Sequence, residues 1–165
     1  MQVSRIARHL LMTPWQVRRA FPRRTLHAVE TAIRASASAH AGEIRFAVEG
    51  ALHGWALYRG QSPRERAIEV FSRLRMWDTD HRNGVLIYVL LADRAVEIVA
   101  DRGAHALVGT QEWEGICRRM EGEFKAGRYE SGVLHGIEAV TGHLARHFPA
   151  TAKEQRALPV RPVVL

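Results

Sequence analysis

Apolar and polar residues follow two distinct periods along the chain, and these periods predict its first helix and its first strand. Within about 25–40, apolar residues recur every three or four positions and Gly42 follows, which predicts a helix that ends before this glycine. The segment GEIRFAVEG then alternates, with Ile44, Phe46 and Val48 on one face, as in a half-buried strand. Its opposite face carries charged side chains and is expected to meet solvent or a functional site.

A second helix and a second strand come next. Ser62, Pro63 and Glu65 form a capping box with proline at the first helical position, a pattern typical of a helix start. The buried stripe expected for this helix consists of Ile68, Phe71 and Leu74. After Gly84, the run VLIYVLLA is apolar on both faces, which favours a central strand covered by helices on both sides.

The remaining pattern completes a small sandwich. After a tight ADR connection, AVEIVA alternates again and predicts a strand that returns as a hairpin, and helical spacing predicts two last helices, from Thr110 and from Tyr129. A strand–helix–strand unit makes its strands parallel through a right-handed crossover, whereas hairpin strands are antiparallel. The sequence therefore predicts an α/β fold over residues 25–149, a three-layer α/β/α sandwich with a small mixed sheet. Residues 150–165 show no period and are expected to be a flexible tail.

The positive charge of the chain is concentrated at its N-terminus. The net charge is +7, but the first 24 residues hold six arginines and no acidic residue, which leaves residues 25–165 close to neutral. Such a partly helical basic arm can bind phosphate groups, on an anionic membrane surface or on nucleic acid. The alternative is that apolar residues such as Ile6, Trp15 and Phe21 dock the arm on the domain. Nucleic acid is the less favoured partner, because no reader motif is present.

Composition limits the cellular compartment and the kinds of metal or cofactor site that the chain can have. The single cysteine, Cys117, excludes an internal disulfide and a cysteine-cluster metal site, and it falls on the apolar stripe of its helix, where a core role is expected. No run reaches the roughly 18 apolar residues of a membrane span, and the N-terminus lacks the apolar region of a secretory signal. We therefore expect a cytoplasmic protein, peripheral to the membrane if the arm binds lipid. No phosphate-binding or dinucleotide-binding glycine motif is present, so no organic cofactor is expected.

Polar residues are expected to gather at one end of the sheet. In a hairpin, the end of the returning strand lies beside the start of the first, so Asp101 and Arg102 should meet the loop before Gly84. This loop supplies Thr79, Asp80, Arg82 and Asn83. Their oxygen atoms suit a hard cation such as Ca²⁺ or Mg²⁺. The plainer alternative is that Asp80 and the Asn83–Gly84 pair only form turns, as Asp93 is expected to do at the opposite end.

Several segments together resemble the TPM domain family, a group of bacterial and plastid domains that were proposed to be phosphatases. They are GEIRFAVE, the strand entry RNGVLIY, the return VEIVADRG, and an F-x-x-G-x-Y-x-x-G segment. This last segment consists of Phe124, Gly127, Tyr129 and Gly132. The resemblance covers about residues 28–148 and is greatest to a short subgroup without a signal peptide or a C-terminal membrane anchor.

The resemblance implies an α/β/α sandwich with a groove that binds divalent cations, calcium in particular, in some members. By motif this groove corresponds to Asp101, Asp80, Thr79 and Asn83. Acidic residues common in the family before GEI and before the helix at Thr110 are absent here. An anion, or an ion pair of Asp101 with Arg82 or Arg102, is therefore the alternative use of this end of the sheet.

Two function hypotheses follow. The first is a non-catalytic, cation-binding domain that works in a protein complex or at the membrane surface, with a LemA-type membrane protein as the partner that the resemblance suggests. The second is a metal-dependent phosphatase in which Asp101 and the 79–83 loop hold the ion that activates water. We favour the first, because a hydrolase also needs a positioned base that the sequence does not reveal.

Overall fold

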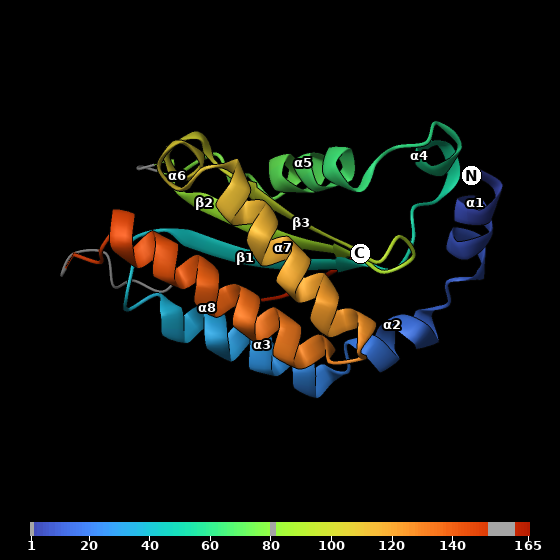
Figure 1. The fold of residues 1–165 in the computed structure, drawn as a ribbon, viewed down its shortest axis with the longest axis horizontal. Helices are drawn as coiled ribbons and strands as arrows, with labels where there is room; N and C mark the ends of the chain where they lie inside the picture. Colours follow the sequence, from blue (N-terminus) through green and yellow to red (C-terminus); the bar gives the residue numbers. More distant parts are fainter. Residues whose placement is uncertain (1, 80–81, 152–160) are drawn as a thin grey trace.

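The computed structural model describes residues 2–79, 82–151 and 161–165 as a sheet between two layers of helices. The helices are α1 (Gln2–Leu11), α2 (Pro14–Ala20), α3 (Arg23–Ser36), α4 (Gly54–Tyr58), α5 (Pro63–Arg73), α6 (Arg102–Val108), α7 (Thr110–Lys125) and α8 (Tyr129–His147). The strands are β1 (Glu43–Glu49), β2 (Gly84–Leu90), β3 (Ala95–Ala100) and β4 (Val163–Val164). Figure 1 shows α5 on one face of the sheet and α3, α7 and α8 on the other, so the three-layer α/β/α prediction is confirmed.

The sheet has the order β3-β2-β1-β4. β1 pairs parallel with β2, from Glu43 opposite Gly84, and β2 pairs antiparallel with β3, from Val85 opposite Ala100. The predicted strand–helix–strand unit and hairpin are therefore both present. The register places the start of β1, the start of β2 and the end of β3 at one end of the sheet, which is where the candidate site residues lie.

Each face of the sheet has its own hydrophobic core. Ile44, Ile87 and Ile98 are among the side chains that face α3, α7 and α8. On the other face, Leu86 and Tyr88 pack with α5. All seven residues of β2 are buried, which confirms its predicted central position. The alternating pattern of β1 and β3 thus reflects two covered faces, because α5 lies over the face that carries Glu49.

The capping box of α5 forms as its sequence predicts, and of the three residues expected on its buried face, Phe71 and Leu74 pack in the core and Ile68 does not. Ser62 Oγ accepts from the Glu65 backbone N–H, and the Glu65 carboxylate accepts from the Ser62 N–H. The side chains toward the sheet are Ala67, Val70 and Phe71, whereas Ile68 is 47% exposed.

Three short elements were not predicted from the sequence. The end of the expected flexible tail forms β4, in which Val163 and Val164 pair with Ala47 and Val48 of β1. The helices α4 and α6 also lie in segments without a clear period. Elements of two to seven residues are too short to establish a hydrophobic period, so the pattern does not reveal them. Residues 152–160 of the expected tail lie outside the described residues.

The N-terminal arm packs against the domain through Phe21 and α1. Phe21 is 3% exposed and its ring lies 5.6 Å from that of Phe46, in the core between sheet and helices. Ile6 of α1 packs against the second core. In the residues that the structure describes, no helix is both long enough and apolar enough to cross a membrane.

Candidate functional site

Backbone hydrogen bonds bring Asp101 and the 79–83 loop together at one end of the sheet. The Asp101 N–H donates to the Gly84 carbonyl over 2.8 Å, and the Gly103 N–H donates to the Arg82 carbonyl over 3.0 Å. The convergence expected from the hairpin register is therefore present for Asp101, Arg82 and Asn83. Asp80, the second predicted carboxylate, lies outside the described residues.

Asp101 is the N-cap of α6, and only one of its two carboxylate oxygens is used. Oδ1 accepts from the Arg102 backbone N–H at 2.7 Å. Oδ2 is buried and has no hydrogen-bond partner in the described part of the chain, and the residue as a whole is 8% exposed. A buried carboxylate oxygen without a partner is costly, so this atom is where a cation or a hydrogen-bond donor would fit best at this end of the sheet.

The loop before β2 is closed by one local hydrogen bond and by a glycine. Thr79 Oγ1 accepts from the Asn83 N–H at 3.1 Å, and the Asn83 side chain is 2% exposed with an unpartnered Nδ2. Gly84 lies directly against the Met76 carbonyl oxygen. A Cβ at position 84 would collide with that oxygen. The glycine thus lets the loop close tightly, with Asn83 pointing inward.

The two arginines contribute backbone atoms to this end of the sheet. The Arg82 carbonyl accepts from both Gly103 and Ala104, so these N–H groups of the first turn of α6 are not free to bind an anion. Arg102 provides its backbone N–H to Asp101. The side chains of Arg82 and Arg102 are exposed, and in the described residues neither forms an ion pair with Asp101. Arg82 has a φ of 50°, a left-handed conformation that reverses the loop before β2.

The donor set at this end of the sheet has the chemistry of a hard-cation site but supplies few of the ligands that such an ion needs. Asp101 Oδ2 and the oxygens of Thr79 and Asn83 are the kind of ligand that Ca²⁺ and Mg²⁺ accept, and water would complete the six to eight positions of calcium. Within residues 2–79, 82–151 and 161–165, no three His, Cys, Asp or Glu side chains are grouped so that they could hold a metal ion. The described residues therefore offer Asp101 and neutral oxygens, because the Glu43 carboxylate at the start of β1 already accepts from Arg45 Nε at 2.6 Å.

A buried histidine at the same end of the sheet was not expected from the sequence. His40, between α3 and β1, is 4% exposed, with Nε2 3.3 Å from Ser36 Oγ. Burial lowers the pKa of His40, so the ring is neutral at physiological pH. Gly42, two residues on, lies against the Asn83 carbonyl oxygen. The ASAHA segment contains no pattern that distinguishes this histidine from a surface one.

Cys117 lacks the chemistry of a nucleophile. Burial, together with the nearby Glu97 carboxylate, raises the pKa of the Cys117 thiol to about 12. The nucleophilic form of cysteine is the thiolate, which is scarce at neutral pH for such a group. The ring of His143, on α8, lies 5.7 Å from that of Trp113 on α7.

Comparison with known proteins gives a family and two similar structures. The TPM domain profile matches residues 19–143. The NMR structure of the BA42 protein from the psychrophilic bacterium Bizionia argentinensis has a TM-score of 0.74 and 30% sequence identity, and the match covers 86% of this chain and 93% of that chain. The NMR structure of the N-terminal domain of a protein from P. gingivalis has a TM-score of 0.56 at 20% identity, over 73% of this chain and 76% of that one.

The second of these structures supports the fold alone, because its identity is low. The search among curated proteins gave no match. The profile match spans both sheet faces, the hairpin, Asp101 and the F-x-x-G-x-Y-x-x-G segment, which agrees with the resemblance seen in the sequence. The chain belongs to the TPM domain family.

Proposed function

We propose that this TPM domain is a non-catalytic module that binds a divalent cation, Ca²⁺ or Mg²⁺, through Asp101 and the 79–83 loop. The observation that carries the proposal is the buried, unpartnered Oδ2 of Asp101. A cation beside this oxygen would balance a charge that is otherwise costly to bury. Thr79 and Asn83 belong to the loop whose Arg82 carbonyl accepts from Gly103, beside Asp101, and a site with few protein ligands suits a weak, exchangeable ion.

A binding role fits this end of the sheet better than hydrolysis does. Metal-assisted phosphoester hydrolysis needs a firmly held ion, a metal-activated water and a positioned acid or base. Asp101 also caps α6, and the Glu43 carboxylate at the start of β1 already accepts from Arg45 Nε. His40 is buried and contacts Ser36, so it is not presented to a substrate.

The cation proposal predicts a thermal shift that depends on Asp101. At a Ca²⁺ or Mg²⁺ concentration tenfold above Kd, stability should rise by about 1.4 kcal/mol, or roughly 3–5 °C in Tm. Asp101→Asn removes the charge but keeps a good N-cap, so the variant should fold and lose the shift. Asp78→Asn is the matched control, because Asp78 is exposed in the same connection and should leave the shift intact.

Two results would contradict this proposal. One is an equal shift in Asp101→Asn, and the other is no shift in the wild type at millimolar Ca²⁺ or Mg²⁺ in constant ionic strength. Turnover of p-nitrophenyl phosphate that requires the ion and is abolished in Asp101→Asn would establish the phosphatase alternative instead.

We further propose that the domain works at an anionic membrane surface. Support comes from apolar side chains that α1, α2 and α4 expose, at the end of the molecule where Figure 1 shows these helices together. They are Leu10, Leu11, Trp15, Trp55 and Tyr58, which are 64–78% exposed. Trp55 stacks on Tyr58 with ring centroids 5.5 Å apart, and Arg59 lies over the Trp55 ring. Aromatic rings beside arginines suit the headgroup region of an anionic bilayer.

Vesicle co-sedimentation tests the membrane proposal. The protein should sediment with phosphatidylserine-containing vesicles more than with pure phosphatidylcholine, and Trp55→Ala with Tyr58→Ala should reduce the bound fraction several-fold. Trp77→Ala is the control, because Trp77 is 58% exposed beyond α5, near the Asp101 end of the sheet. Equal sedimentation with both vesicle types, or an equal loss in Trp77→Ala, would contradict it. Phe21 belongs to the core, so point variants are preferable to deletion of residues 1–24.

A further inference from the structure

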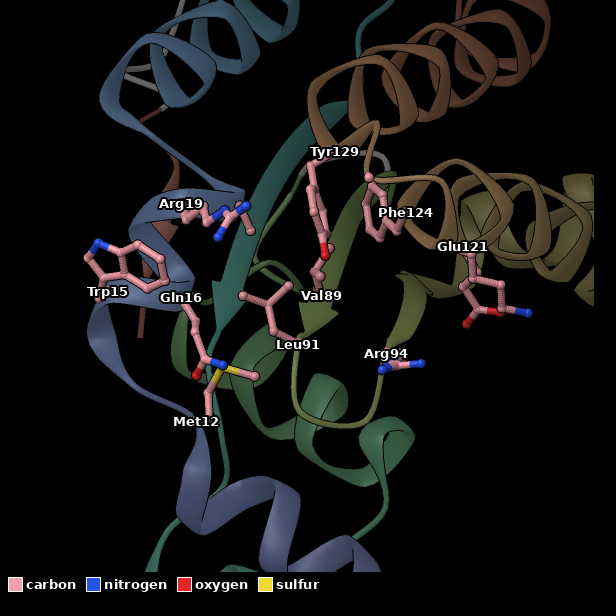
Figure 2. A pocket seen from close by; sticks show the side chains of 13 residues that line it. Met12, Trp15, Gln16, Arg19, Val89, Leu91, Arg94, Glu121, Phe124 and Tyr129 are labelled. Carbon is pink, nitrogen blue, oxygen red and sulfur yellow. The ribbon is translucent and has the colours of Figure 1, made fainter.

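A cavity of about 600 Å³ opens at the end of the sheet opposite Asp101, between α2 and the C-terminal end of α7. Figure 2 shows α2 as one wall, the last turn of α7 with Tyr129 as the opposite wall, and the end of β2 with its turn between them. This volume lies within the range of small-molecule sites. It is lined by residues from segments far apart in the sequence, so it exists only in the folded chain.

The floor of the cavity is apolar and aromatic. Val89 and Leu91 line it from the sheet, and the rings of Phe124 and Tyr129, with centroids 5.2 Å apart, line it from the helical side. In Figure 2 the Tyr129 ring extends toward Leu91, with its hydroxyl at the cavity. Gly127, with a φ of 75°, ends α7 and lets the chain turn back so that Tyr129 reaches this position. The floor therefore suits a flat, apolar group.

The rim is cationic. Arg19, Arg94 and Lys125 line the cavity, and within the described residues none of them is paired with a carboxylate. The acidic residue at the rim, Glu121, is already engaged, because its Oε1 accepts from the Val96 N–H at 3.0 Å. The cavity thus has an excess of positive charge with free donors.

Arg19 is positioned by a contact that leaves its N–H groups available, and Arg94 is carried by the turn between β2 and β3. The Arg19 guanidinium lies 5.4 Å from the centroid of the Trp15 ring, a cation–π contact that consumes no hydrogen-bond donor. Arg94 is the last residue of the β2–β3 turn, where its N–H donates to the Leu91 carbonyl. Its φ of 53° is uncommon outside glycine and asparagine. Figure 2 shows Arg19 on the α2 wall and Arg94 across the cavity from it, so an anion between them could contact both walls.

We propose that this cavity binds a small organic anion in which a carboxylate or phosphate is attached to an aromatic ring system. The rings pack on Tyr129, Phe124 and Leu91, and the anionic group accepts hydrogen bonds from Arg19 and Arg94. Charge-assisted bonds from a planar guanidinium are among the strongest for such groups. A purely apolar ligand would leave the cationic rim unused, and an inorganic anion would leave the aromatic floor exposed.

This site is independent of the candidate cation site. It lies by the end of β2 and the start of β3, whereas Asp101 lies at the end of β3. Trp15 and Gln16 precede residue 19, where the match to the TPM domain begins, while Phe124, Gly127 and Tyr129 belong to the family segment. The arm thus adds a wall to a surface that the family domain provides.

Two-dimensional NMR titration of the full chain with 2-naphthoate and with adenosine monophosphate tests the proposal and separates the two anionic groups. Saturable binding should shift the backbone amides of Leu91, Gly127 and Tyr129. Arg19→Gln and Arg94→Gln should each weaken binding about tenfold. Arg18→Gln, which removes the same charge from the exposed neighbour on α2, should leave binding unchanged. 2-Naphthamide, with the same rings and no charge, should bind at least tenfold more weakly than 2-naphthoate.

Several outcomes would overturn the proposal. These are no saturable shift with either anion at millimolar concentration, equal binding of 2-naphthamide, an equal loss in Arg18→Gln, or shifts confined to other parts of the molecule. Because α2 is a wall of the cavity, the spectra of Arg19→Gln and Arg94→Gln without ligand must match the wild type away from the substitution. If Arg19→Gln alone disturbs α2, Arg94→Gln decides the result, since it lies on the opposite wall.

Discussion

Replacing Glu49 by alanine is expected to lower the free energy of unfolding by about 3–5 kcal/mol, the usual effect of removing one partner of a buried ion pair. Glu49 is 6% exposed at the end of β1. Its carboxylate accepts from Arg66 Nε and Nη2 at 2.8 and 2.9 Å and from the Tyr88 hydroxyl at 2.6 Å. Hydrogen bonding to Glu49 raises the pKa of Arg66, and burial raises the pKa of Tyr88. Alanine would leave the buried Tyr88 phenol without its acceptor and the Arg66 guanidinium with only its contact to Glu69, 3.0 Å from Nη1.

Thermal and urea unfolding measure this effect, with a loss of roughly 10 °C expected in Tm. Tyr88→Phe removes one hydrogen bond and keeps the ion pair, so it should lower stability by only about 1 kcal/mol. Glu114→Ala is the matched surface control. Its contact with Arg118 spans 3.5 Å between exposed side chains and is expected to contribute less than about 0.5 kcal/mol. A Glu49→Ala loss no larger than that of Glu114→Ala would contradict the assignment.

Glu49 also shows how far the hydrophobic pattern of a strand can be read. Alternation in β1 correctly predicted a strand and the face that holds Ile44 and Phe46. It also grouped Glu49 with the solvent-facing side chains, because a charged residue in a period-2 pattern normally marks the wet face. The pattern does not contain the position of α5, whose Arg66 lies over this face and neutralises the carboxylate. Long-range ion pairs of this kind depend on tertiary packing.

The candidate cation site was also predictable only in part. The meeting of Asp101 with the 79–83 loop follows from hairpin register alone, so sequence reasoning could place these residues at one end of the sheet. The capping role of Asp101 was not predicted, because α6 has seven residues and lacks a helical hydrophobic period. The aromatic cavity was also missed. It depends on where α2 docks, and no local pattern determines that position.

The N-terminal arm is a third case in which tertiary contacts differ from the sequence prediction. Some of its basic side chains are bound to the domain. Asp93, expected to form only the turn between β2 and β3, has a side chain 8% exposed and accepts from Arg5 at 2.7 Å and from His9 Nε2 at 3.1 Å. The Leu52 N–H donates to His9 Nδ1 over 2.9 Å, which places the ring proton on Nε2, toward Asp93. Arg5 also donates to the Gln61 carbonyl. Asp93 is thus the acidic partner of both Arg5 and His9 where α1 docks on the domain.

Asp93→Asn is therefore expected to undock α1 while the domain remains folded. The substitution leaves Arg5 without its counter-ion, and loss of one partner of a buried, hydrogen-bonded charge pair weakens docking by about 2–5 kcal/mol. A helix of ten residues is marginal without tertiary contacts, so α1 should unfold once released. In hydrogen exchange, the amides of residues 4–11 should lose protection, with those of β2 as the unchanged reference. Arg8→Gln is the control, because Arg8 is 52% exposed and 3.7 Å from Asp93.

The same contact should make docking of α1 in the wild type sensitive to acid. Burial alone would raise the pKa of the Asp93 carboxyl, but hydrogen bonds from Arg5 and His9, together with the charge of Arg5, outweigh it and hold this pKa below its ordinary value. The stabilising contribution is then fully present above the unfolded pKa of about 3.9 and is lost as the pH falls through the lower folded value. Protection of residues 4–11 should therefore be constant from neutral pH to about 4 and fall below it, whereas Asp93→Asn should lack protection throughout. Loss of protection in both proteins at the same pH would mean that another group holds α1 in place.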